Sequence, residues 1–172
     1  MKADGADRYF DYAATAPPFE EALSAQVETA RTWFGNPSSA HRPGTAAHAE
    51  LERLRGMLAA LCGFADGRVV LMSGATEANN WVVHGVMHAT GSGRVLVAAD
   101  VHASVWNVCR RHADRMDVLP LDGKGRIGLT ALAAAIRADT RLVSCTHVAS
   151  ETGVVQDAGA IAAVCERRGI LC

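Results

Sequence analysis

Small polar residues follow an apolar run at residues 68–72 and could hold an anion. The sequence there reads SGAT, and residues 75–89 are predicted to continue as a helix. Gly74 would permit close approach to the backbone, and the free N–H groups of Ala75 and Thr76 would open a helix whose dipole favours negative charge. The Thr76 hydroxyl would add a donor. The segment therefore suggests a phosphate cradle, although its spacing also fits a plain capped helix start.

Two further loops place polar side chains directly after predicted strands. His102 follows the predicted strand at 94–99, and Ser150 follows the predicted strand at 141–148. In open parallel sheets, ligands lie outside the carboxyl ends of the strands. We therefore expect His102, Ser150 and the cradle to face one site, while a solvated surface role remains the plain alternative for a loop histidine.

The elements that must position these residues alternate along the chain. Such alternation predicts an α/β fold with a mostly parallel sheet and helices packed on both faces. Strands are expected at 8–12, 68–72, 94–99, 116–121, 141–148 and 169–172, and helices at 19–34, 45–62, 75–89, 103–114, 129–137 and 157–168.

The composition indicates an ordinary globular protein. Apolar residues make up 49% and charged residues 20% of the 172 residues, and the formal net charge is -1. Without a basic block, a nucleic-acid or acidic-membrane partner has no electrostatic support. The start has no secretory h-region and the apolar runs are too short to span a bilayer, so we expect a cytoplasmic protein. The cysteines and histidines lack zinc spacing, so no metal is expected.

Five segments together resemble a known family. They are YFDYAATAP (9–17), FGNPSSAHRPG (34–44), LMSGATEANN (71–80), DVHASVWNVCR (100–110) and HVASETGVVQD (147–157). In this order and spacing they are similar to the N-terminal part of the cysteine desulfurases, pyridoxal-phosphate enzymes of the class V aminotransferase group. The resemblance implies the large domain of a fold-type I pyridoxal-phosphate enzyme. Residues 1–18 would be an N-terminal segment, and 19–172 an incomplete large domain without the small C-terminal domain.

The resemblance also implies roles for single residues. Gly74, Ala75 and Thr76 would hold the phosphate of pyridoxal 5'-phosphate, and His102 would stack on its ring and assist proton transfer. Ser150 matches a family asparagine that bonds the phenolic oxygen of the cofactor, because this chain reads Ala-Ser where the family has Asn-Asn. Two loop residues, Asn36 and His41, would lie near the site and the dimer contact.

The family reaction converts L-cysteine to L-alanine and transfers a persulfide for iron–sulfur cluster and thio-cofactor assembly. It implies a sulfur-acceptor protein, such as an iron–sulfur scaffold, and a homodimer for the full-length parent. The alternatives are a selenocysteine lyase or another class V transaminase, and a non-catalytic half that binds or complements a second polypeptide.

The family reaction requires a lysine that holds the cofactor covalently, so the lysines of this chain bear on its activity. It contains two, Lys2 and Lys124, in the N-terminal segment and in a polar turn. Neither matches the family lysine that holds the cofactor covalently, and the aspartate that pairs with the pyridine nitrogen and the mobile-loop cysteine are also unmatched. We therefore expect this chain alone to lack desulfurase activity.

Overall fold

The computed structural model describes residues 8–64 and 66–172. The chain divides into two compact units, Met1–Leu71 and Met72–Cys172. Each unit is described by itself below. Lys2 lies outside the described residues.

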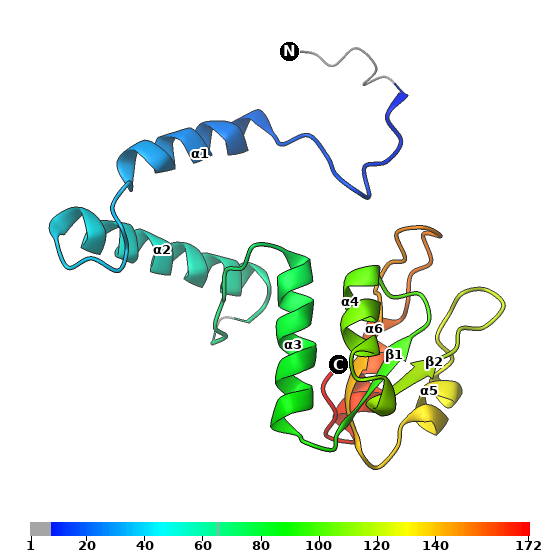
Figure 1. Cartoon of the computed structure of the whole chain (residues 1–172). Helices are drawn as coiled ribbons and strands as arrows, with labels where there is room; N and C mark the ends of the chain where they lie inside the picture. Colours follow the sequence, from blue (N-terminus) through cyan, green and yellow to red (C-terminus); the bar gives the residue numbers. More distant parts are fainter. Residues whose placement is uncertain (1–7, 65) are drawn as a thin grey trace. The chain divides into compact units, whose positions relative to one another are not determined.

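Two helices make up the regular structure of the first unit, α1 (Glu20–Thr32) and α2 (Arg42–Leu61) (Figure 1). Glu20 and Glu21 occupy the first turn of α1, where acidic side chains complement the helix dipole. The ring of His41 caps α2, because its Nδ1 accepts a hydrogen bond from the Gly44 N–H at 3.2 Å. The cap explains why α2 begins three residues before the predicted start at 45.

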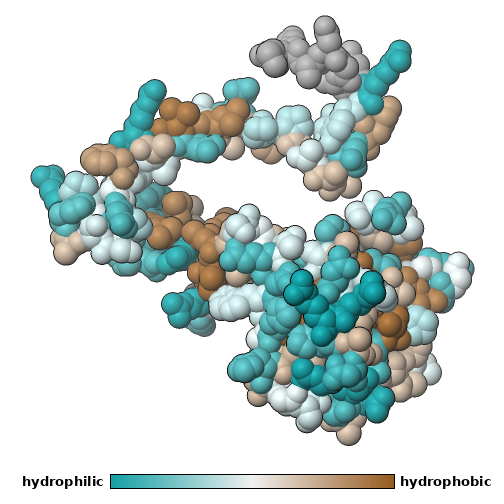
Figure 2. Space-filling model, in the orientation of Figure 1, coloured by the Kyte–Doolittle hydropathy of each residue, from teal (hydrophilic) through white to brown (hydrophobic). Residues whose placement is uncertain are grey.

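Both helices of the first unit expose apolar side chains. Figure 2 shows hydrophobic surface over each of them, and the exposed residues include Leu23 and Val27 on α1 and Met57 and Leu61 on α2. Within its described residues, α1 buries no side chain. The helical spacing of apolar residues therefore predicted these helices correctly, and their apolar faces are exposed.

The second unit is built around a parallel sheet. Its strands are β1 (Arg94–Ala98), β2 (Met116–Leu119) and β3 (Thr140–Ser144), in the spatial order β2-β1-β3. Both pairings of β1 are parallel, with Val97 opposite Val118 of β2 and Ser144 of β3. Parallel strands need crossover connections, and each of these contains a helix.

Helices cover both faces of this sheet. They are α3 (Ala75–Ala89), α4 (Ala103–Arg110), α5 (Leu129–Ala135) and α6 (Ala158–Glu166), with a short 3₁₀ helix, η2 (Ala113–Arg115), after α4. Successive residues of β1 point to opposite faces: Val95 and Val97 pack with residues of α3 and α4, whereas Leu96 packs with residues of α5 and α6. A strand buried on both faces reads as a continuous apolar run, so the predicted α/β fold is confirmed.

Two predicted strands do not form in the described residues. Residues 8–12 and 68–72 have no strand structure. A strand must pair its backbone N–H and C=O groups with a neighbouring strand, and neither segment forms such a ladder among the described residues. Apolar content alone was a poor guide at both positions.

Several predicted strands and helices were also longer than the observed ones. The strand expected at 141–148 ends at Ser144, and the helix expected at 103–114 ends at Arg110, with η2 following. The helix predicted at 129–137 ends at Ala135, where the next residue, Ile136, is extended. The strand expected at 169–172 appears as a single parallel bridge between Leu142 and Leu171.

Candidate functional site

The start of α3 presents backbone donors of the kind that bind anions. Gly74 occupies the N-cap position, and among the described residues no side chain caps this end. Ala75 and Thr76 occupy the first two helical positions, whose N–H groups have no partner within an α-helix. A Cβ atom built on Gly74 would meet no described heavy atom within 4 Å, so the space beside the cap is open. The chemistry of this donor set fits a phosphate group.

Glu77 fixes the residue that precedes this helix start. Its Oε2 accepts hydrogen bonds from the Ser73 N–H and the Ser73 hydroxyl, both at 2.7 Å. Both bonds favour the ionised carboxylate, so they hold the pKa of Glu77 below its ordinary value. The turn that leads into α3 is therefore ordered by a side chain of the helix itself.

His102 occupies the start of the neighbouring helix, α4. Its Nδ1 accepts a hydrogen bond from the Ser104 N–H at 3.1 Å and lies 2.8 Å from the Ser104 hydroxyl. The ring is exposed, and it lies at the carboxyl end of β1, as the sequence predicted. The second ring nitrogen, Nε2, is thus the one left for a ligand.

A cavity of about 370 Å³ joins the loops after the three strands. His102 lines it from the loop after β1, Ser150 from the segment after β3, and Leu121 and Gly125 from the loop after β2. The predicted convergence of His102 and Ser150 at one edge of the sheet is therefore observed. Gly74, Ala75 and Thr76 are not part of its lining.

The part of this cavity that β2 contributes was missed by sequence reasoning. The carboxyl end of β2 meets the same edge as the other strands, so the loop at 120–128 was open to the same argument. Its lysine, Lys124, was predicted to lie in a polar turn, and no site residue was predicted in this loop.

Asp100 adds an unsatisfied group to the cavity. Its Oδ1 is buried and has no hydrogen-bond partner among the residues that the structure describes. Buried polar oxygens are normally paired, so a donor from a ligand or from solvent fits beside it.

Other candidate residues take local structural roles. Asn36 Oδ1 accepts a hydrogen bond from the Ser38 N–H at 2.9 Å, and His41 caps α2, so both are described within the first unit. Lys124 is exposed in the turn after β2, where its N–H donates to Asp122 Oδ1 at 2.8 Å.

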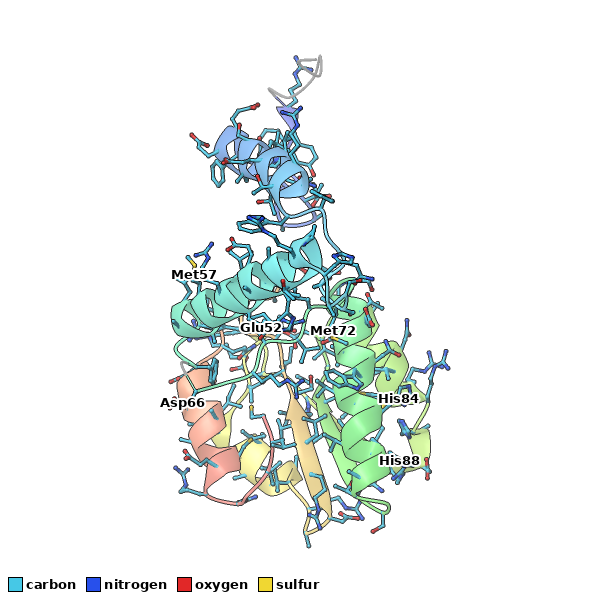
Figure 3. The ribbon with its side chains drawn as sticks, turned by 90° about the vertical axis from the view of Figure 1, so that its left-hand side faces the viewer. Glu52, Met57, Asp66, Met72, His84 and His88 are labelled. Carbon is cyan, nitrogen blue, oxygen red and sulfur yellow. The ribbon has the colours of Figure 1, made fainter. Side chains whose placement is uncertain are left out.

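Two further histidines lie on α3. His84 and His88 lie one turn apart (Figure 3), but His84 Nδ1 lies 2.9 Å from His112 Nε2. Burial, the His84 ring and the Arg115 guanidinium lower the pKa of His112. Within residues 8–64 and 66–172, no group of three or more His, Cys, Asp or Glu residues is arranged to hold a metal ion. No helix in these ranges is long and apolar enough to cross a membrane.

Known proteins are similar to this chain in sequence and in fold. The cysteine desulfurase IscS of Haemophilus ducreyi is 36% identical over 171 residues, which cover 95% of this chain and 42% of that protein. A solved structure described as a NifS-like protein superposes with a TM-score of 0.87 at 25% identity, over 93% of this chain and 45% of that one.

A second solved structure, described as SspA in complex with cysteine, gives a TM-score of 0.81 at 28% identity, over 94% of this chain and 48% of that one. The chain thus spans less than half the length of each of these proteins. The sequence profile of the aminotransferase class-V family matches residues 8–172. Since this match includes the α3 cradle, His102 and Ser150, the chain belongs to the aminotransferase class-V family.

Proposed function

We propose that this chain forms one wall of the pyridoxal 5'-phosphate site of a cysteine desulfurase. The observation that carries the proposal is the start of α3, where no described side chain caps the helix and the space beside Gly74 is open. The similarity to IscS supports the assignment of this cradle to a cofactor phosphate. The bound cofactor would supply an electron sink.

The remaining site residues would act on the ring end of the cofactor. His102 would lie against the ring and hold or deliver a proton at Nε2, because its Nδ1 is already engaged by Ser104. The Ser150 hydroxyl would donate to the phenolic oxygen, and the cavity that it shares with His102 would exclude bulk water from that edge.

We also propose a substrate, partners and a location. L-cysteine is the proposed substrate, supported by a solved structure at 28% identity that is described as containing cysteine. A sulfur-acceptor protein of the iron–sulfur scaffold class, a homodimer in the full-length parent and a cytoplasmic location complete the proposal.

This chain alone is proposed to bind the cofactor without reacting. Lys124 is exposed in a turn and does not line the cavity of His102 and Ser150, so the described residues offer no amine for covalent attachment there.

Borohydride trapping tests this proposal. The purified chain is mixed with pyridoxal 5'-phosphate, its visible spectrum is recorded, and intact mass is measured after borohydride reduction. We expect a shifted absorption band that saturates with cofactor, no stoichiometric adduct at Lys124, and no alanine or sulfide from L-cysteine above the rate of free cofactor. A specific adduct at Lys124 or turnover of cysteine would contradict the proposed inactivity. A spectrum identical to that of the free cofactor would contradict the proposed site.

A further inference from the structure

A chain of hydrogen bonds connects α3 to the ring of His102. Asn79 Nδ2 donates to Ser104 Oγ at 2.9 Å, and Ser104 Oγ lies 2.8 Å from His102 Nδ1. The Ser104 N–H donates to the same Nδ1 at 3.1 Å. Asn79 and Ser104 are half-buried between two helices that pack side by side, as Figure 1 shows, and they lie 25 residues apart in the sequence.

These bonds decide which nitrogen of the neutral ring carries the proton. For the Ser104 N–H to donate to Nδ1, that nitrogen must offer a lone pair, which in a neutral ring requires the proton on Nε2. The Asn79 amide group occupies one lone pair of Ser104 Oγ by donating to it. This leaves the hydroxyl hydrogen free to point at Nδ1, where it shares the single lone pair with the Ser104 N–H.

We propose that Asn79 and Ser104 are positioning residues that hold His102 as the Nε2–H tautomer. In this state the exposed edge of the ring presents a proton donor and not a lone pair. The inference deepens the proposed function and rests on it where it concerns a cofactor beside His102. The tautomer itself is a property of this chain's own residues.

Helix capping alone does not account for the arrangement. A cap at the start of α4 requires the backbone N–H of residue 104, which any residue but proline supplies. The Ser104 hydroxyl and the Asn79 amide are additional, and they act in series on one nitrogen. The adjacent Asn80 provides the contrast, since its Nδ2 donates to the Thr76 carbonyl of its own helix at 2.8 Å.

The substitution Asn79→Asp tests the chain of bonds with little change of shape. A carboxylate only accepts hydrogen bonds, so Asp at this position would draw the Ser104 hydroxyl hydrogen toward itself. Ser104 Oγ would then face His102 Nδ1 with a lone pair, which favours a proton on Nδ1. Ser104→Ala removes the hydroxyl and keeps the N–H, and Ser104→Thr restores a hydroxyl at the same place.

The measurement is the ¹⁵N NMR spectrum of the imidazole rings in the whole chain at pH 8.5, where neutral imidazoles predominate. The His102 signals are assigned by their loss in His102→Gln. We expect predominantly Nε2–H in the unaltered chain and in Ser104→Thr. In Asn79→Asp and Ser104→Ala, we expect a fall of roughly fivefold in the Nε2–H to Nδ1–H ratio, the change that one net hydrogen bond implies. The matched control, Asn80→Asp, should keep the original ratio.

The tautomer of His102 measured in the unaltered chain tests the inference even if a variant fails to fold. A His102 ring with its proton mainly on Nδ1 would overturn the inference, as would folded Asn79→Asp and Ser104→Ala variants with an unchanged ratio. Addition of pyridoxal 5'-phosphate separates the two claims. If the Nε2–H to Nδ1–H ratio falls in the variants but the unaltered chain binds no cofactor, the positioning role is supported and the proposed function is contradicted. Cofactor binding with an unchanged ratio would contradict the positioning role alone.

Discussion

Ser73 donates twice to a single carboxylate oxygen of Glu77, from its backbone N–H and from its hydroxyl, both at 2.7 Å. Glu77 lies in the first turn of α3, so its negative charge also complements the dipole of that helix. The pair fixes the chain at the entrance to the candidate phosphate cradle. It also makes the order of that entrance dependent on the ionisation of one side chain.

Acid should therefore weaken the start of α3. The hydrogen bonds from Ser73 hold the pKa of Glu77 below the ordinary value of 4.5, so the folded state releases this proton more readily than the unfolded state does. The stabilisation is fully present above pH 4.5 and is lost as the pH falls through the lowered pKa. Thermal unfolding followed by circular dichroism from pH 7 to pH 3 should show a smaller loss of Tm in Glu77→Gln than in the unaltered chain. Equal losses of Tm in the two proteins would show that the Ser73–Glu77 pair contributes nothing to the pH dependence of stability.

The core on the α5 and α6 face of the sheet should be sensitive to truncation. Leu132 of α5 is fully buried at 0% exposure, whereas Leu129 of the same helix is 43% exposed. Leu132→Ala should lower the free energy of unfolding by about 2–5 kcal/mol, because it removes contacts and leaves a cavity. Leu129→Ala is the matched control and should cost less than about 1 kcal/mol. Denaturant unfolding measures both, and similar losses would contradict the described packing of α5.

The loop that carries Ser150 depends on a glycine conformation. Gly153 has a φ of 71°, and its N–H donates to the Ala149 carbonyl at 2.8 Å, which closes the turn around Ser150. Gly153→Ala should cost about 1–2 kcal/mol, because a Cβ atom disfavours left-handed backbone.

Gly128 serves as the comparison for this substitution. Its φ is -75°, and the nearest heavy atom to an added Cβ would be the Ala131 Cβ at 3.9 Å. Gly128 is also the N-cap of α5, where alanine is less favourable than glycine, so Gly128→Ala should cost less than about 1 kcal/mol in the same denaturant titration. A larger cost at Gly128 than at Gly153 would mean that the Ser150 loop is not held as described.

Sequence patterns predicted the elements that are buried on both sides or capped by local chemistry. The apolar run of β1 was predicted as a strand, and the helix at 75–89 was predicted at its observed bounds, with Gly74 before it and Gly91 shortly after it. The segment at 68–72 was wrongly predicted as a strand. Apolar residues alone do not make a strand, because its backbone groups also need a pairing partner.

The candidate site was predictable to the extent that it follows from strand ends. His102 and Ser150 lie after β1 and β3, and the shared direction of the strands brings both to one cavity. The link from Asn79 through Ser104 to His102 depends on side-chain geometry between two packed helices. Neither residue type nor spacing revealed it, because asparagine and serine are common at exposed helix starts for other reasons.

Cofactor titration tests the central claim most directly, since it asks whether the backbone donors of α3 hold the phosphate of pyridoxal 5'-phosphate. The phosphorus NMR signal of the cofactor is followed against increasing chain, for the unaltered protein and for Ala75→Pro. Proline is tolerated at the first helical position and removes only the N–H donor there. Thr76→Val serves as a second variant that removes the hydroxyl.

We predict saturable binding to the unaltered chain and a loss of affinity of roughly tenfold in Ala75→Pro, as expected for a hydrogen bond to a charged group. Thr76→Val should show a smaller loss, and α3 should remain helical in both variants. Equal affinity of the unaltered chain and Ala75→Pro would contradict the assignment of the phosphate to this helix start.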